Sequence, residues 1–524
     1  MMTGGEVLVR SLAAHGVETV FGIPGTHNLE VYRHLTAFAI RHVTPRHEQG
    51  AGYAADGYAR TTGRPGVVVT TTGPAVLNAA AAVGQAYSDS VPMLVVAPGP
   101  PVRHPQRGTG MLHEMRDQRG ALAAVTGTAH RATSHAEISE AVAQAFGEMA
   151  GQRPRPVYLE VPLDLLAEKA DVSIVDPIPV SPREPDRELV AEAARRLAEA
   201  HRPGLLLGGG VKAAAAHARE LAEALRAPVL ATTNGKGILP EDHPLWVGAA
   251  LHLRAASSFV EDCDVLMAVG TELASTDWWH GTPRPEYLIR VDNDPAQLVV
   301  NARPQLAIAA DAGRALDSIQ AALPPVPTRD GDRAATWRSR HRQEAREEGA
   351  RWVPTLDALA SVLDRDAVVA ADNAMACYYG ALGNLPVHTP GGFCFPTGYG
   401  TLGYAVPAAL GAAIANPRRQ VVALVGDGGL MFSVQELATV AAERISLPVV
   451  VFVNGGYGEI RAQMRQAGIA PVGVDLPVPD FVALAQSLGG RGVVVELPGD
   501  VGDEVRAAFE RPGPTLVIVD EPAA

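Results

Sequence analysis

Short runs of apolar, β-branched residues alternate with alanine-rich segments of helical periodicity along the whole chain. Such runs are typical of strands buried on both faces of a parallel sheet, and the segments between them are typical of crossover helices. The pattern therefore predicts an α/β fold made of doubly wound parallel sheets. The clearest predicted strands are residues 66–72, 93–97, 204–207, 265–269, 421–425 and 448–453.

Two interruptions divide this alternation. Residues 171–186 are rich in proline, and residues 324 to about 351 begin with PPVPTRDGDR and continue as a charged segment that predicts an exposed helix. Both are typical of linkers. A chain of 524 residues is also long enough for about three domains. We predict an N-terminal domain at 1–170, a central domain at 187–323 and a C-terminal domain at 352–524.

Composition excludes several classes of protein. Acidic residues outnumber basic ones by 57 to 44, the net charge is −13, and the basic residues are scattered, which argues against a nucleic-acid-binding surface. The three cysteines, Cys263, Cys377 and Cys394, show neither disulfide nor zinc-ligand spacing. No apolar stretch approaches the ~20 residues of a membrane span, and the N-terminus lacks a signal-peptide pattern. We expect a soluble, cytoplasmic protein.

The sharpest local signal lies in residues 420–460, where an apolar strand, a GDGG turn, a helical segment and a second strand precede Asn-Gly-Gly. Glycines in such a turn let the backbone approach a bulky anion, and a following helix offers free N–H groups. Ser433 and Glu436 stand at capping-box spacing, which predicts a helix start near them.

Asp427 and Asn454 follow the two strands of this segment, so they should lie side by side at the carboxyl edge of a parallel sheet. Their oxygens suit Mg²⁺, which takes few protein ligands together with phosphate oxygens and water. The motif alone leaves a plainer interpretation open, in which GDGG is only a turn and Asn454 a helix cap.

This segment resembles the metal and diphosphate motif of the thiamine-diphosphate enzymes of the acetolactate synthase, pyruvate decarboxylase and benzoylformate decarboxylase group, in which GDG is followed by NN. The resemblance implies that Asp427, Asn454 and the backbone carbonyl of Gly456 bind the metal. Val453 replaces the first asparagine of the pair, which loosens the motif and spares the ligand. The cofactor contacts implied from this segment are Gly426, Asp427, Gly428, Gly429, Asn454, Gly456, Tyr457, Gly458, Glu459 and Ile460. Tyr457 is equally well explained by packing.

A second motif, residues 45–78, strengthens the resemblance. It implies that Glu48 bonds to N1′ of the cofactor's aminopyrimidine and that Gly73 and Asn78 belong to the matching glycine-rich element. Proton exchange at N1′ promotes formation of the C2 carbanion that attacks the substrate. By itself, Glu48 is equally a first-turn glutamate favoured by the helix dipole.

Two further segments match the same group. Leu402, in residues 396–413, occupies the position of the side chain that bends the cofactor, although its periodicity alone describes a core leucine. Pro24, Thr26 and His27 follow a predicted strand end. His27 and His113 suit proton transfer because histidine titrates near neutral pH. A structural role for either histidine stays open, as does the identity of the proton donor, because Glu114 replaces the second histidine of a pair common in the decarboxylases.

Acidic and aromatic residues suggest the substrate. Asp277 and Trp278 lie in the loop STDWWHG, and together with Glu114 and Glu459 they suit a cationic substrate tail. The tryptophans equally suit a subunit contact. The chain looks most like 5-guanidino-2-oxopentanoate decarboxylases and the acetolactate-synthase-like proteins.

The resemblance therefore implies a thiamine-diphosphate- and Mg²⁺-dependent 2-oxo acid decarboxylase that works through a C2 carbanion and an enamine. Alternatives are an acetolactate-synthase-like carboligase and a non-catalytic cofactor-binding relative. The family places its active sites between subunits, which implies a homodimer or homotetramer. FAD is not expected, because GTELASTDWW replaces an arginine-containing stretch, although the glycines at 208–210 are compatible with a dinucleotide site.

Overall fold

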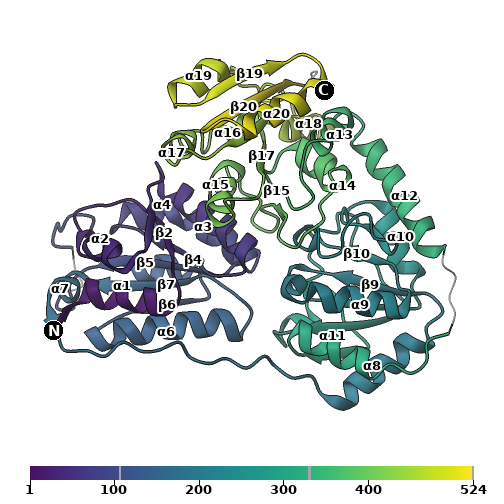
Figure 1. The fold of residues 1–524 in the computed structure, drawn as a ribbon, viewed down its shortest axis with the longest axis horizontal. Coiled ribbons are helices and arrows are strands. Elements are labelled where there is room, and N and C mark those ends of the chain that lie inside the picture. Colours follow the sequence, from purple (N-terminus) through teal and green to yellow (C-terminus); the bar gives the residue numbers. More distant parts are fainter. Residues whose placement is uncertain (105–107, 328–331, 522–524) are drawn as a thin grey trace.

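The computed structural model describes residues 1–104, 108–327 and 332–521. Within them, three six-stranded sheets carry flanking helices, and all strand pairs inside these sheets are parallel (Figure 1). The predicted α/β fold with three doubly wound parallel sheets is confirmed. Five of the six runs predicted as strands lie wholly within strands of these sheets, and the sixth, 66–72, contains the strand Gly66–Val69.

The N-terminal unit has the strand order β3-β2-β4-β5-β7-β6, and the antiparallel pair β1 and β8 joins its two ends. Its strands are β1 (Met2–Thr3), β2 (Thr19–Gly22), β3 (Arg41–Val43), β4 (Gly66–Val69), β5 (Met93–Gly99), β6 (Thr128–Arg131), β7 (Val157–Pro162) and β8 (Lys169–Ala170). Its helices are α1 (Gly4–Ala14), α2 (Leu29–Leu35), α3 (Glu48–Thr62), α4 (Pro74–Ser88), α5 (Gln118–Ala123), α6 (His135–Gly151) and α7 (Leu163–Ala167).

The middle unit has the strand order β11-β10-β9-β12-β13-β14. Its strands are β9 (Pro203–Leu207), β10 (Val229–Ala231), β11 (Trp246–Gly248), β12 (Val265–Val269), β13 (Tyr287–Asp292) and β14 (Leu306–Ala309). Its helices are α8 (Arg187–Glu199), α9 (Ala215–Leu225), α10 (Arg254–Asp262) and α11 (Ala312–Ala321), followed by α12 (Arg333–Glu348).

The C-terminal unit has the strand order β16-β15-β17-β18-β20-β19. Its strands are β15 (Val368–Ala371), β16 (Phe393–Cys394), β17 (Val421–Gly426), β18 (Leu447–Val453), β19 (Arg491–Val495) and β20 (Pro514–Asp520). Its helices are α13 (Val353–Ala360), a π-helix at Ala376–Ala381, α14 (Leu382–Asn384), α15 (Ala405–Ala415), α16 (Asp427–Leu430), α17 (Glu436–Ala442), α18 (Gly458–Gln466), α19 (Phe481–Ser487) and α20 (Val501–Phe509).

The two predicted linkers differ in the structure. Residues 171–186 form neither helix nor strand and run between the N-terminal and middle units (Figure 1). The second segment contains α12, while residues 328–331 lie outside the described residues. The predicted helix forms, but it is exposed on one side only, because Trp337, His341 and Ala345 form a buried stripe that packs on the middle unit.

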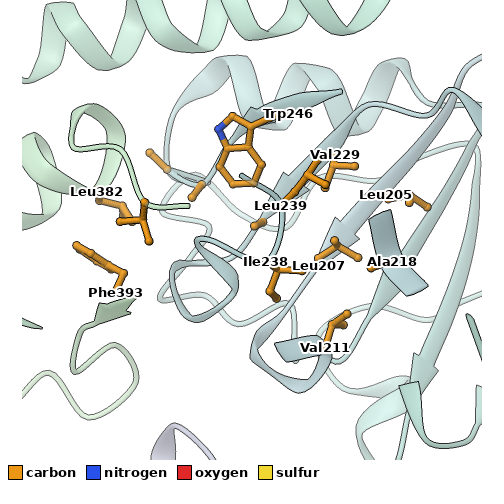
Figure 2. Packing of buried hydrophobic residues seen from close by; sticks show 14 of the residues in the cluster. Leu205, Leu207, Val211, Ala218, Val229, Ile238, Leu239, Trp246, Leu382 and Phe393 are labelled. Carbon is orange, nitrogen blue, oxygen red and sulfur yellow. The ribbon is translucent and has the colours of Figure 1, made fainter. Parts of the chain in front are cut away.

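Hydrophobic contacts join the units. Leu382 and Phe393 of the C-terminal unit belong to the same buried cluster as Ile238 and Leu239 of the middle unit (Figure 2). The N-terminal and C-terminal units meet where α3 packs on α15. A Cβ on Gly411 would lie 1.8 Å from the carbonyl oxygen of Ala54, so only glycine allows this approach. Among the described residues, no helix combines the length and apolar character needed to cross a membrane.

Candidate active site

The sheet of the C-terminal unit brings the GDGG turn and the Asn-Gly-Gly loop together. β17 and β18 are adjacent and parallel, so the residues after Gly426 and Val453 emerge at the same edge. The strand order reverses between β15 and β17, and ligands bind α/β sheets in the crevice at such a switch point. Asp427 is 5% exposed, and its Oδ2 accepts hydrogen bonds from the backbone N–H groups of Gly455 and Gly456 at 2.9 and 3.0 Å.

Two buried oxygens at this edge have no hydrogen-bond partner among the described residues, namely Oδ1 of Asp427 and Oδ1 of Asn454. Nδ2 of Asn454 donates to Oε2 of Glu521 at 3.4 Å, while Nε1 of Trp352 donates to the other carboxylate oxygen. Glu521 thereby orients the amide and leaves Oδ1 of Asn454 available as a ligand. A carboxylate oxygen and an amide oxygen without other partners fit a hard divalent cation. Sequence reasoning missed Glu521, whose one visible signal is its place directly after β20.

The helix that follows the GDGG turn differs from the prediction. α16 has only four residues, and the next helix, α17, begins at Glu436. No capping box forms, because Oγ of Ser433 lacks a hydrogen-bond partner among the described residues and the Glu436 side chain turns toward the N-terminal unit. The Glu436 carboxylate accepts the backbone N–H groups of Arg46 and His47 and the hydroxyl of Thr439. Burial raises the pKa of Glu436.

This contact fixes the backbone just ahead of Glu48, the first residue of α3. Glu48 itself is half-buried, and its Oε2 accepts a hydrogen bond from Nδ2 of Asn78 at 2.9 Å. Asn78 lies exposed on α4, which begins at Pro74. The structure therefore brings together the two elements of the second motif. The sequence analysis placed Glu436 in a capping box and missed this contact, because its backbone partners lie about 390 residues away in the chain.

Gly73 and the two histidines lie at the corresponding switch point of the N-terminal sheet, between β2 and β4. Nδ1 of His27 lies 2.6 Å from Oγ1 of Thr72, and Nδ1 of His113 lies 3.1 Å from the same hydroxyl. The two rings meet edge to face, with centroids 5.5 Å apart. Desolvation, and then the charge of His113, lowers the pKa of His27.

The backbone at Gly73 admits only glycine, because φ is 60° and a Cβ would lie 2.5 Å from the carbonyl oxygen of His113. His113 also has a positive φ, 62°, which is uncommon for a residue with a side chain. The N–H of Gly73 donates to Gln118, whose own amide donates to Tyr158 and Glu160. Gln118 is a buried support for this site that the sequence analysis did not identify.

Other predicted residues take different positions. Pro24 and Thr26 are exposed on the loop between β2 and α2. The carboxylate of Glu114 accepts the backbone N–H groups of Thr109 and Gly110 at 2.8 to 3.0 Å and stabilises its own loop, and a contact of Glu114 with the substrate stays a prediction. The hydrogen bond from the Thr109 backbone, partly opposed by desolvation, lowers the pKa of Glu114.

Leu402 is half-buried on the loop ahead of α15. Asp372, at the end of β15, holds this loop, since its Oδ2 accepts the N–H of Gly403 at 2.9 Å. Burial raises the pKa of Asp372 to about 6. After the Asn-Gly-Gly loop, the ring of Tyr457 lies against Gly428 and Ile460 is 46% exposed, while Gly456 of the loop pairs with Asp475 in an isolated bridge.

The tryptophan loop requires a correction. Trp278, the predicted substrate contact, is 2% exposed and lies in the hydrophobic core of the middle unit, whereas Trp279 is 45% exposed. Asp277 accepts the hydroxyl of Thr233 at 3.3 Å, and burial raises its pKa to about 6. Asp277 lines a pocket of about 410 Å³ that all three units enclose, together with Arg60, Asp89, Gly209, Gly210, Lys212, Thr397 and other residues.

Comparison with known proteins places these features in a family. Models of the thiamine pyrophosphate enzymes match residues 2–121 (N-terminal TPP binding domain), 190–319 (central domain) and 374–519 (C-terminal TPP binding domain). The chain is 41% identical to a probable 2-ketoarginine decarboxylase of Pseudomonas aeruginosa, over 98% of this chain and 93% of that protein. It is 31% identical to a probable acetolactate synthase large subunit of Methanocaldococcus jannaschii, over 100% of this chain and 92% of that protein. It is 32% identical to the acetolactate synthase isozyme 2 large subunit of Escherichia coli, over 99% of this chain and 96% of that protein.

Proposed function

Because the chain belongs to the family of thiamine pyrophosphate enzymes, we propose that it decarboxylates a 2-oxo acid with thiamine diphosphate and Mg²⁺. The observation that carries this proposal is the pair of buried, unpartnered oxygens on Asp427 and Asn454. They provide two hard ligands beside the glycines of the GDGG turn, and the carbonyl of Gly456 provides a third. Gly426, Gly428 and Gly429 lie beside these ligands, and backbone without side chains there would let the diphosphate approach closely.

Residues of the chain have distinct roles in this proposal. When bound, thiamine diphosphate would supply a nucleophilic C2 carbon for addition to the keto carbon and a thiazolium nitrogen able to take up the electrons released with CO₂. The carboxyl group of Glu48 exchanges a proton with N1′ of the pyrimidine, and its hydrogen bond from Asn78 holds it in position. Leu402 supports the cofactor from the loop ahead of α15.

His27 and His113 are the proposed proton-transfer groups for the reacting carbon. The lowered pKa of His27 leaves the ring neutral, and therefore able to accept a proton, at neutral pH. The hydroxyl of Thr72 lies within hydrogen-bond distance of both rings, so it links them into one chain.

The proposed substrate is 5-guanidino-2-oxopentanoate, which is 2-ketoarginine. The similarity to a probable 2-ketoarginine decarboxylase over nearly the whole of both chains supports it. The similarity to acetolactate synthase large subunits favours a second candidate, in which the donor fragment is joined to another carbonyl compound.

Further proposals concern the whole protein. We propose a cytoplasmic homodimer or homotetramer with active sites between subunits, and domain limits at 1–170, 187–323 and 352–524. The absence of helices and strands from residues 171–186 supports the first boundary. The absence of FAD stays a prediction, and flavin absorption bands in the purified protein would contradict it.

The test is CO₂ release and product mass with thiamine diphosphate and Mg²⁺, for 5-guanidino-2-oxopentanoate, pyruvate and benzoylformate, each with and without an aldehyde acceptor. We expect CO₂ from the guanidino acid, with an aldehyde as product; a ligated product would select the carboligase.

Glu48→Gln should lower kcat by about 10²-fold or more because the N1′ proton exchange is lost, while thermal unfolding stays unchanged. A chain that binds the cofactor but releases no CO₂ from any substrate would instead be a non-catalytic relative.

A further inference from the structure

An aromatic cluster with one carboxylate lies beside residues 454–458, which we call the metal loop because it carries the proposed ligands Asn454 and Gly456. Tyr378 and Tyr379 come from the π-helix, and their ring centroids are 4.6 Å apart. Trp279 of the middle unit makes T-shaped contacts with both rings, at centroid distances of 6.2 and 5.6 Å. Glu459, in the first turn of α18, accepts the hydroxyl of Tyr379 with both oxygens at 3.3 Å. We call these four residues the aromatic–carboxylate cluster.

The cluster adjoins the loop that carries the proposed metal ligands Asn454 and Gly456. Glu459 follows Gly456 by three residues, and a Cβ on Gly458 would lie 3.0 Å from the Asn454 amide and 3.2 Å from the sulfur of Met375. Met375 directly precedes the π-helix, so the helix carrying the tyrosines touches the metal loop. Single π-helical turns occur frequently at functional sites. Asp277, by contrast, points into the separate pocket with Arg60 and Lys212.

We propose that the aromatic–carboxylate cluster receives the guanidinium group of a 2-oxo acid substrate, and thereby sets the preference for a cationic side chain. This inference rests on the proposed function. A planar guanidinium stacks on aromatic rings and donates two parallel hydrogen bonds to a carboxylate, and the cluster offers both kinds of partner.

The details of the cluster suit this ligand. Trp279 is 45% exposed although it stacks on His252, so part of the indole is accessible to a ligand. On the Glu459 carboxylate, Nε2 of Gln463 donates to Oε1 at 2.9 Å. The hydrogen bonds from Tyr379 are long at 3.3 Å, and these are the ones that a guanidinium can replace at little cost. Burial, followed by the charge of Glu459, raises the pKa of Tyr379 to about 12, which keeps its hydroxyl neutral.

Charges around the cluster are predominantly negative or already paired. Glu348 bonds to His252 at 2.7 Å behind Trp279 and adds a second carboxylate near Tyr379. Arg351 pairs with Glu521. The Glu459 carboxylate is therefore the group best placed to attract a cation at this side of the metal loop.

The experiment compares kcat/KM for 5-guanidino-2-oxopentanoate with that for 2-oxohexanoate, a neutral substrate. Glu459→Gln should reduce the ratio of the two values by about tenfold or more, because a charge-assisted, bidentate contact is lost. Tyr379→Phe should change the ratio less, because it keeps the ring. Asp503→Asn, which removes a carboxylate 79% exposed on α20, is the matched control and should leave the ratio at the wild-type value. A ratio that falls in Asp277→Asn and not in Glu459→Gln would overturn the proposal.

A binding measurement separates this inference from the proposed function. Calorimetric titration with 4-guanidinobutanoate, which lacks a keto group, should give a Kd about tenfold weaker for Glu459→Gln than for the wild type. If the wild type releases no CO₂ from any 2-oxo acid, the proposed function fails, and the two Kd values still test the cluster. Equal Kd values, in variants whose thermal unfolding matches the wild type, would show that the cluster does not bind a guanidinium.

Discussion

The pairing of Asn454 with Glu521 shows how a single side chain prepares a ligand. An amide can present either oxygen or nitrogen, and the Glu521 carboxylate accepts only the N–H₂ group, so the oxygen is directed away from it. Partners of this kind usually change metal affinity by about 10- to 100-fold. Glu521 should therefore act as a positioning residue, although it does not itself belong to the proposed ligands.

We expect Glu521→Ala to weaken Mg²⁺ binding by about tenfold, because Asn454 loses the partner that orients it. Calorimetric titration of Mg²⁺ in the presence of thiamine diphosphate measures this directly, without turnover. Glu521→Gln keeps one acceptor oxygen and should lose less affinity. Glu510→Ala, on the exposed end of α20, controls for the loss of a nearby charge. An unchanged Kd for Mg²⁺ in Glu521→Ala would show that Glu521 does not orient Asn454 and serves only its contact with Trp352.

At the scale of elements, α12 carries a buried histidine that makes stability depend on pH. His341 is 3% exposed, one ring nitrogen lies 3.2 Å from the carbonyl oxygen of Ala250, and burial lowers its pKa from 6.5 to about 4. Between these values the unfolded chain binds the proton and the folded chain does not. The free energy of unfolding should therefore fall as the pH falls from 6.5 to 4, by about 3 kcal/mol in all at this site.

Denaturant unfolding at several pH values checks this, with His341→Asn as the comparison. The variant should be less stable at pH 7 but lose less stability on acidification, because it has no proton to take up at this position. Parallel pH profiles for the two proteins would contradict the assignment.

Elements differ in how far the sequence predicts them. The six apolar runs predict strands because a strand buried on both faces needs no information beyond its own residues. The α12 stripe was also predictable, since Trp337, His341 and Ala345 recur every four residues, but the charges between them suggested exposure. The Glu436 contact could not be predicted from the sequence, because local spacing favoured a capping box while the actual partners belong to another unit.

The candidate site shows the same division. Asp427, Asn454 and Glu48 follow from short motifs whose strand ends place them at a sheet edge or helix start. Trp278 and Trp279 are adjacent in sequence, and only tertiary packing determines that the first is buried and the second exposed. The aromatic–carboxylate cluster joins three distant segments, so neither of its tyrosines carries a signal that a sequence pattern reveals.

At the scale of the whole molecule, the two motifs occupy different sheets, and each has exposed neighbours. Leu77, next to Asn78 on α4, is 50% exposed, and Met431 and Phe432, just beyond the GDGG turn, are each 46% exposed. Exposed apolar side chains beside both halves of a site are typical of a surface that another subunit covers. This supports the proposal that Glu48 of one subunit completes the Asp427 site of another.

Mixing two inactive variants tests that arrangement. Glu48→Gln and Asp427→Asn should each be nearly inactive alone. If active sites form between subunits, a heterodimer of the two variants has one site with both residues intact, so subunit exchange should restore about a quarter of the wild-type activity. If each site lies within one chain, every chain in the mixture keeps a defect, and activity should stay at the level of the separate variants. Glu48→Gln mixed with itself under the same exchange conditions is the control, because it can form no intact site in either arrangement.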